Sequence, residues 1–221
     1  QETLAEQTYQ ELRRWVLEGG MKPGTQLIYR TLASQMKVSL APVREAIQRL
    51  AAEGLIENIP GAGAFVRTLS KKEIEELYIV REALESTAAA EAALNRTGEQ
   101  ANEIEAVCRD ADAVVEEIRK RETHTATKEL QDRWLNLEER FHDALVEAAR
   151  NGLLKKSIQD CQALHRVFAS QRGQPDLLTL DIAEPTCRDH AALASAVRKR
   201  DAEQARLLMV GHIRQGRRST L

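Results

Sequence analysis

Residues 32–50 constrain the fold of this chain more than any other stretch. They have the pattern of a short helix, a tight turn that ends at Ser39, and a second helix that Pro42 opens. Proline suits the first turn of a helix, because the N–H that it lacks has no partner there. Two helices joined in this way let the first brace the second, which can then enter the major groove of DNA. The pattern therefore predicts a helix-turn-helix and favours DNA binding.

The flanking residues predict a complete small module. Three helices and two short strands are expected from the spacing of apolar residues and from β-leaning composition, over residues 2–18, 30–36, 42–53, 55–59 and 64–67. Between the two strands, residues 60–63 read Pro-Gly-Ala-Gly, which favours a hairpin turn. This order of elements predicts a winged helix-turn-helix domain over residues 1–68.

The rest of the chain predicts only helices. Ser70 and Glu73 have the spacing of a capping box, which marks a helix start. Six or seven helices are expected, over residues 71–95, 99–121, 127–150, 153–171, 177–182, 185–200 and 202–217. The predicted fold class is thus mainly α: the winged helix-turn-helix domain, then an all-α bundle over residues 69–221 for effector binding and dimerisation.

The net charge of the chain neither indicates nor excludes DNA binding. The net charge is −2, and residues 1–68 contain eight Lys or Arg against seven Asp or Glu. Phosphate contacts supply most of the non-specific affinity for DNA. A DNA-binding module with so few cations must therefore concentrate them on one face.

The cysteines and the hydropathy pattern indicate a cellular compartment. Cys108, Cys161 and Cys187 lie far apart in the sequence, which favours free thiols in a reducing environment. The sequence has no apolar run of membrane-spanning length and no secretory leader. We therefore expect a cytoplasmic protein with no membrane association.

Seven residues of the module are candidates for DNA contact. A guanidinium can grip a phosphate or bind the edge of guanine, and the hydroxyl of Ser39 can bond a phosphate. Glycines at the hairpin tip would let it approach the minor groove without a side-chain clash. The alternative for the helix arginines is an ion pair with Glu45 or Glu53 on a solvated face. The candidates are Arg30, Ser39, Pro42, Arg44, Arg49, Gly61 and Gly63.

A second set of residues has the chemistry of a metal site. Glu138 and His142 are four residues apart on a predicted helix, so their side chains point the same way. With His190 and His212 from two later helices, they could converge on a divalent metal inside a bundle. An octahedral ion with four protein ligands retains two positions for water or a carboxylate. The alternative is that each histidine has an ordinary surface or core-edge role.

The N-terminal motifs resemble a known family. Residues 21–27, 38–39, 42–47, 53–56 and 61–66 look like the winged-helix domain of the GntR family of bacterial transcription regulators. The resemblance covers nearly all of the first 68 residues. Family members commonly have Arg directly after the serine, where this chain has Leu40. We therefore expect an operator that differs from the usual one of the family.

The later motifs resemble the FCD effector domain of the FadR branch of that family. They comprise residues 138–145, residues 151–154 and the stretch from His190 to His212. The resemblance implies that Glu138, His142, His190 and His212 bind a divalent metal, with zinc as first choice and nickel, manganese or iron as alternatives. Glu138 stands where many such domains have Asp, which leaves the identity of the metal and direct ligation by Glu138 open.

Two further residues are candidates for effector binding. The resemblance implies that Arg81 faces the effector pocket, where its fork of N–H donors suits a carboxylate. The alternative is an Arg81–Glu85 pair along one helix. His165 is the second candidate, because its predicted helix could line the same pocket.

These expectations combine into a transcription regulator. We expect a homodimer that binds a double-stranded DNA operator, because two half-sites a helical turn apart need two modules. A small organic acid would shift the population of domain placements, with release of repression as the default and activation left open. The alternatives are a regulator that responds to the metal itself, a metal-free sensor of anions, and a metal-dependent enzyme. We expect no enzyme, since no further base or nucleophile is evident.

Overall fold

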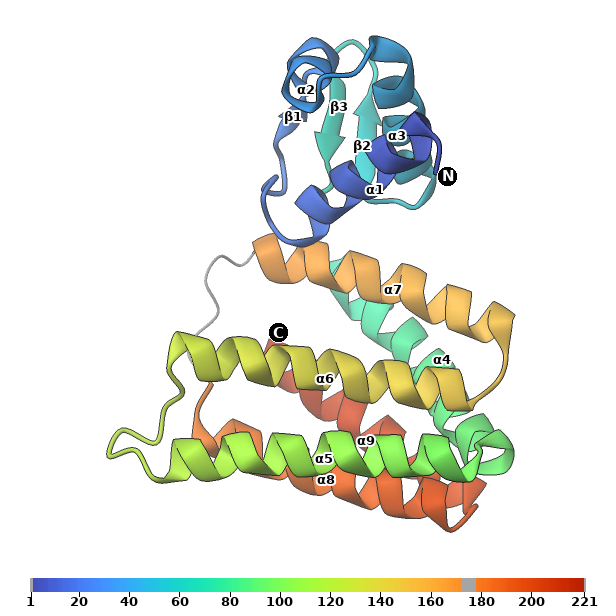
Figure 1. Ribbon diagram of the computed structural model, residues 1–221, viewed down its shortest axis with the longest axis vertical. Coiled ribbons are helices and arrows are strands. Elements are labelled where there is room, and N and C mark those ends of the chain that lie inside the picture. Colours follow the sequence, from blue (N-terminus) through green and yellow to red (C-terminus); the bar gives the residue numbers. More distant parts are fainter. Residues whose placement is uncertain (1, 172–177, 221) are drawn as a thin grey trace. The chain divides into compact units, whose positions relative to one another are not determined.

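The computed structural model describes residues 2–171 and 178–220, and the chain divides into two compact units (Figure 1). Unit 1 contains the chain up to Ile74 together with the end of α7 (Gly152–Gln171) from Gln159 onward. Unit 2 contains Glu75–Ile158 and the helices α8 (Leu180–Arg198) and α9 (Ala202–Thr220). In the described ranges, no helix combines the length and the apolar character that crossing a bilayer requires.

Unit 1 contains the predicted winged helix-turn-helix. Its elements are α1 (Leu4–Leu17), β1 (Gln26–Leu27), α2 (Tyr29–Met36), α3 (Leu40–Ala52), β2 (Ile56–Ile59) and β3 (Gly63–Val66). The three strands form an antiparallel sheet in the order β1-β3-β2. The prediction of three helices and a hairpin is confirmed. The two-residue strand β1 was not predicted, because so short a strand leaves no periodicity in the sequence.

The orientation of α3 follows from one buried stripe along it. Val43, Ala46, Ile47 and Leu50 are all fully buried and pack in the core that α1 and the sheet share. These positions recur at helical spacing, so the opposite face of α3 must point outward. Burial of the apolar stripe thus sets which side chains of α3 a ligand can reach.

A capping box begins α4 (Lys71–Asn95) directly after the winged helix. The Ser70 backbone N–H donates to Glu73 Oε2 over 2.9 Å, and the Glu73 N–H donates to Ser70 Oγ over 3.3 Å. Arg67 adds an ion pair of 2.6 Å to the other oxygen of Glu73. Nearby, the side-chain amide of Gln171 donates to the carbonyl of Leu69 and accepts from its N–H. The predicted capping box is confirmed.

Unit 2 is a layered bundle of long helices. It contains most of α4, then α5 (Gly98–Arg119), α6 (Lys128–Ala148), the start of α7, α8 and α9. Helix α5 packs against both α6 and α8, and α8 packs against α9 (Figure 1). Alanines and β-branched residues form much of the buried surface, which agrees with the aliphatic composition.

The expected separate helices over residues 177–182 and 185–200 are wrong. In the described part of the chain α8 runs without a break from Leu180 through Pro185 to Arg198, and residue 177 lies outside the described residues. Pro185 is the sixth residue of the helix, past the N–H groups of the first turn that have no partner, so α8 lacks one backbone hydrogen bond there and continues without it. Helices α4 to α9 are therefore the six that the described residues after Ser70 form.

The capping box predicts a pH-dependent contribution to stability. The hydrogen bonds from the Ser70 hydroxyl and N–H, followed by Arg67, lower the pKa of Glu73 to about 2. This contribution is complete above about pH 4.5, the ordinary value, and is lost as the pH falls toward 2. We expect Glu73→Gln to lower the free energy of unfolding at pH 7 by a modest amount, since the pair is partly exposed.

Urea unfolding of Glu73→Gln and wild type from pH 7 to pH 3 measures this effect. The difference between the two proteins should shrink below pH 4.5. Glu57→Gln is the matched control, because Glu57 is exposed on β2 and forms no ion pair among the described side chains. A difference that stays constant over the whole range would contradict the role of the ionised Glu73.

Candidate DNA-binding surface and metal centre

The cations of the winged helix fall into a paired and an unpaired set. Four of the eight in residues 1–68 form ion pairs within unit 1: Arg13 with Glu53, Arg14 with Glu11, Arg49 with Glu6, and Arg67 with Glu73. Lys22, Arg30, Lys37 and Arg44 are exposed and have no ion pair with any described residue. Four cations therefore remain that could bind a phosphate without breaking an ion pair.

Three of these unpaired cations lie on the helix-turn-helix. Arg30 is in the first turn of α2, Lys37 ends α2 with a left-handed backbone (φ 54°), and Arg44 lies on the outer face of α3. Ser39 occupies the N-cap position of α3, yet its exposed side chain makes no capping hydrogen bond. Its hydroxyl and the N-terminus of α3 can therefore both serve an anion. Leu40, which follows it, is 37% exposed.

Arg49 and Pro42 have internal roles in the module. The Arg49 guanidinium binds Glu6 over 2.8 Å and lies 3.7 Å from the centre of the Tyr9 ring. The Tyr9 hydroxyl in turn donates to Glu53. Pro42 is buried in the first turn of α3. Arg49 thus fastens α3 to α1, although its side chain remains 39% exposed, and Pro42 opens the helix.

The wing between β2 and β3 has its two glycines at the tip. Gly61 and Gly63 are exposed and have φ angles of 79° and 109°, in the region that favours glycine. A Cβ at Gly61 would meet nothing within 4 Å, so the backbone angle alone requires glycine there. The side-chain amide of Gln26 donates to the Ala62 carbonyl and ties β1 to the tip.

Inside unit 2, three helices bring together the four predicted metal ligands. One turn of α6 supplies Glu138 and His142, while α8 supplies His190 and α9 supplies His212. One ligand atom from each of the four lies within 4.8 Å of every other. Ligand atoms about 2.1 Å from a shared ion would be roughly 3–4.2 Å apart, so a small contraction brings all four to one ion.

The cluster is buried, and it has little to offset the burial of its polar atoms. Among the described residues no Lys or Arg pairs with Glu138, whose Oε1 lies 3.5 Å from His190 Nδ1, and burial raises the pKa of the Glu138 carboxyl to about 7 against the opposing effect of His142. Burial, with the neighbouring imidazoles, lowers the pKa of His190 and of His212. His190 Nε2 is buried with no hydrogen-bond partner in the described structure. Neutral imidazoles beside a carboxylate are the donor set that divalent transition metals take, so these residues fit a metal.

Neighbouring side chains hold two of the rings. Phe141 stacks on His190 with ring centres 3.8 Å apart and an angle of 15° between the planes. Glu85 of α4 lies 3.0 Å from His142 Nδ1. Burial lowers the pKa of His142, but the hydrogen bond and charge of Glu85 outweigh this effect and leave the pKa raised. His142 differs in this respect from the two other imidazoles.

The two candidate effector residues lie in different places. Arg81 is mostly buried, and its Nε donates to Glu85 Oε1 over 2.7 Å, which is the helix pair expected as the alternative to effector binding. Because Glu85 also contacts His142, Arg81 is one residue away from the metal cluster. His165 lies on the part of α7 that belongs to unit 1, with its ring 6.4 Å from that of Phe168. It is not one of the four cluster residues.

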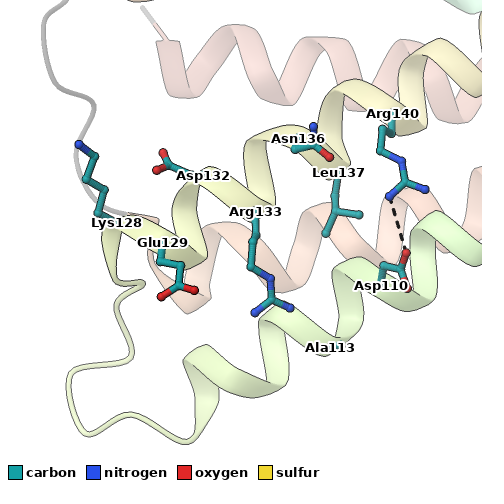
Figure 2. Close-up of a pocket in the computed structure, with 9 residues that line it drawn as sticks. All are labelled: Asp110, Ala113, Lys128, Glu129, Asp132, Arg133, Asn136, Leu137 and Arg140. Atoms are coloured by element: carbon teal, nitrogen blue, oxygen red, sulfur yellow. Dashed lines mark ion pairs between the residues drawn. The ribbon is translucent and has the colours of Figure 1, made fainter.

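A separate hollow of about 750 Å³ opens on the surface between α5 and α6 (Figure 2). Asp110 and Arg140 form an ion pair of 3.8 Å across it, and Lys128, Asp132 and Arg133 add charges of both signs. None of the four cluster residues lines it. Its open shape and mixed charge favour no particular ligand.

Family models match both parts of the chain. Residues 4–66 match the model "Bacterial regulatory proteins, gntR family", and residues 76–215 match the FCD domain. The chain belongs to the GntR family. It is a DNA-binding transcription regulator with a C-terminal FCD domain and not an enzyme, and the predicted fold class is confirmed.

Curated relatives cover nearly the whole GntR-family chain. The HTH-type transcriptional repressor RspR of Escherichia coli K12 is 26% identical over 216 residues, which are 95% of this chain and 86% of that protein. The repressor GlaR of the same strain is 26% identical over 208 residues, or 93% and 90%. An HTH-type regulator from the TAR-I ttuE-ttuC' intergenic region of Agrobacterium vitis is 34% identical over 143 residues, or 64% and 78%.

Solved structures share the fold. E. coli McbR/YncC has a TM-score of 0.72 at 21% identity, with 98% of this chain and 96% of that chain covered. A putative GntR regulator from Rhodococcus sp. RHA1 has the same TM-score and coverage at 18% identity. At these identities the likeness extends to the fold alone.

Two residues near these sites were missed at the level of sequence. Lys37 was not a candidate, although it is one of three unpaired cations on the helix-turn-helix. Glu85 was considered only as a partner of Arg81, whereas its second oxygen reaches His142, 57 positions later in the chain. No local signal could find either, because pairing and long-range contact depend on tertiary structure.

Proposed function

We propose that this GntR-family regulator is a dimeric, ligand-responsive repressor. In this proposal residues 1–68 bind the operator, and residues 69–221 bind a divalent metal, a small carboxylate effector and a second copy of the chain. The repressor assignment is supported by RspR and GlaR, two relatives that are named as repressors. Dimerisation is supported by the geometry of palindromic operators, which need two reading modules.

The operator face consists of Arg30, Lys37, Ser39 and Arg44, with the Gly61–Gly63 wing tip beside it. Three of the four unpaired cations among the described residues up to 68 belong to this face, and a module with almost no net charge needs such a concentration for phosphate binding. Arg44 is in the middle of the exposed face of α3, the place from which a side chain reaches base edges. We therefore assign base reading to Arg44.

The metal ligands in this proposal are Glu138, His142, His190 and His212. The observation that carries the assignment is the convergence of their ligand atoms within 4.8 Å in the interior of unit 2. Burial of these groups without a counter-charge costs free energy, and a divalent ion would offset that cost. Zinc is our first choice for the ion, and nickel, manganese and iron also accept imidazole and carboxylate together.

The effector in this proposal is an anion with a carboxylate group. Arg81 is the residue that supports it, since a guanidinium prefers a planar carboxylate and this one lies next to the cluster through Glu85. A bound ion would add a second point of attachment for the same anion. Binding there would favour one placement of the two reading modules, and only one placement fits the operator.

Arg44→Ala tests the assignment of base reading. The substitution should weaken binding to DNA selected by the wild-type protein from a random pool by about 1–3 kcal/mol, with a much smaller loss on random duplex. Arg14→Ala is the control, because it removes the same charge from an exposed residue of α1 that pairs with Glu11. Fluorescence anisotropy on both duplexes measures the effect. Equal losses on selected and random DNA would restrict Arg44 to phosphate contact.

Glu138→Gln tests the metal assignment with little change in shape. We expect a loss of zinc affinity greater than the roughly 10–100-fold that follows loss of an outer partner. Stability of the metal-free protein should be retained, because burial already disfavours the ionised form of Glu138. His142→Ala should lower the metal content as well, while the protein stays helical by circular dichroism.

Elemental analysis and chelator competition measure both variants. His124→Asn is the control, since His124 is exposed and not one of the cluster residues, and Asn tolerates its positive φ of 49°. Unchanged metal stoichiometry in both Glu138→Gln and His142→Ala would reject the site.

A further inference from the structure

We propose that Glu85 is a positioning residue of the metal centre, which fixes the ring and the tautomer of His142 so that its Nε2 lone pair faces the other ligands. This inference rests on the proposed function, because it concerns the same metal site. Glu85 is not one of the four cluster residues and reaches them from α4, a helix that supplies no ligand.

Glu85 is a buried carboxylate with a cation at one oxygen and an imidazole at the other. Its side chain is 3% exposed. Oε1 accepts from Arg81 Nε over 2.7 Å, and Oε2 lies 3.0 Å from His142 Nδ1. A buried carboxylate needs partners of this kind, because its charge is costly in the interior unless it is paired.

The contact with His142 decides which ring nitrogen carries the proton. Glu85 Oε2 is buried without a hydrogen-bond partner in the described structure, and His142 Nδ1, 3.0 Å away, is placed to donate to it. With the proton on Nδ1, His142 donates to that oxygen, whereas with the proton on Nε2 the oxygen would be buried and unsatisfied. An unsatisfied buried acceptor on a charged group costs about 1–3 kcal/mol or more. Glu85 therefore selects the tautomer with the proton on Nδ1.

In this tautomer the lone pair of His142 that can bind a metal is on Nε2. His142 Nε2 lies 3.3 Å from Nε2 of His212, on the side of the ring where the ligand atoms converge. A carboxylate that accepts from the far nitrogen of a ligating imidazole orients the ring and raises its basicity. Arg81 completes the chain of contacts, because its guanidinium keeps the carboxylate from rotating away.

Glu85→Gln tests this role, and Glu82→Gln is its matched control. Glu82 lies on the same helix and pairs with Arg214 over 2.8 Å, so its substitution also breaks an ion pair of α4. The glutamine at 85 keeps the size of the side chain but loses its charge and can present an amide donor to His142. We expect the dissociation constants for Zn²⁺ and Mn²⁺ to rise about 10–100-fold in Glu85→Gln and to stay unchanged in Glu82→Gln.

The measurements are chelator competition on full-length, metal-depleted protein and the visible absorption spectrum after loading with Co²⁺. The spectrum reports the ligand field, so a residue with only a structural role would leave it unchanged. Glu85→Asp supplies a conservative variant that keeps the charge but withdraws it by one methylene. We expect it to bind more tightly than Glu85→Gln and to show an altered Co²⁺ spectrum.

The outcomes separate this inference from the proposed metal site. A wild-type protein that binds none of these ions would overturn the proposed site itself. If Glu138→Gln loses affinity while Glu85→Gln keeps wild-type affinity and spectrum, the positioning role alone is rejected. Should Glu85→Gln fail to fold, Glu85→Asp decides, since wild-type affinity together with a wild-type spectrum in that variant would reject the role of Glu85.

Discussion

Burial of polar side chains in the interior of unit 2 is the constraint on which the rest of that unit depends. An imidazole or a carboxylate removed from water costs free energy unless a partner satisfies it. Glu85 Oε1 accepts from Arg81, whereas Glu85 Oε2 and His190 Nε2 are buried without a hydrogen-bond partner in the described structure, with His142 Nδ1 3.0 Å from that oxygen of Glu85. The surrounding helices therefore tolerate an arrangement that is poor for stability by itself, which is typical of a site built to hold a ligand.

The electrostatic constraint on the winged helix is its low net charge. A DNA-binding module with eight cations and seven anions cannot attract a duplex by its net charge. Ion pairs within unit 1 neutralise half of these cations. Two of the pairs, Arg49–Glu6 and Arg13–Glu53, also fasten α1 to α3 and its C-cap. Three of the four cations that remain, Arg30, Lys37 and Arg44, lie on the helix-turn-helix. Pairing thus leaves most of the unpaired positive charge on the elements that are proposed to bind DNA.

Local patterns were sufficient to predict most of the secondary structure, and long-range contacts account for the failures. Residues 40–52 bury one stripe at helical spacing and the Ser70–Glu73 box is local, so both were predictable. Pro185 favoured a helix break, yet α8 continues through it, because the loss of one backbone hydrogen bond does not outweigh the packing of the helix, which buries residues on both sides of the proline. Arg49 and Arg44 look equivalent in sequence, and only the position of Glu6 on another helix distinguishes them.

The sequence by itself determined the order of the elements, the family motifs and the four metal-ligand candidates, because periodicity, capping and motif spacing are properties of neighbouring residues. The tertiary structure alone decided which cations stay unpaired, that the part of α7 with His165 belongs to unit 1, and that Glu85 meets His142. Those facts depend on which helix faces which, and helix packing brings together residues whose separation in sequence carries no information about contact.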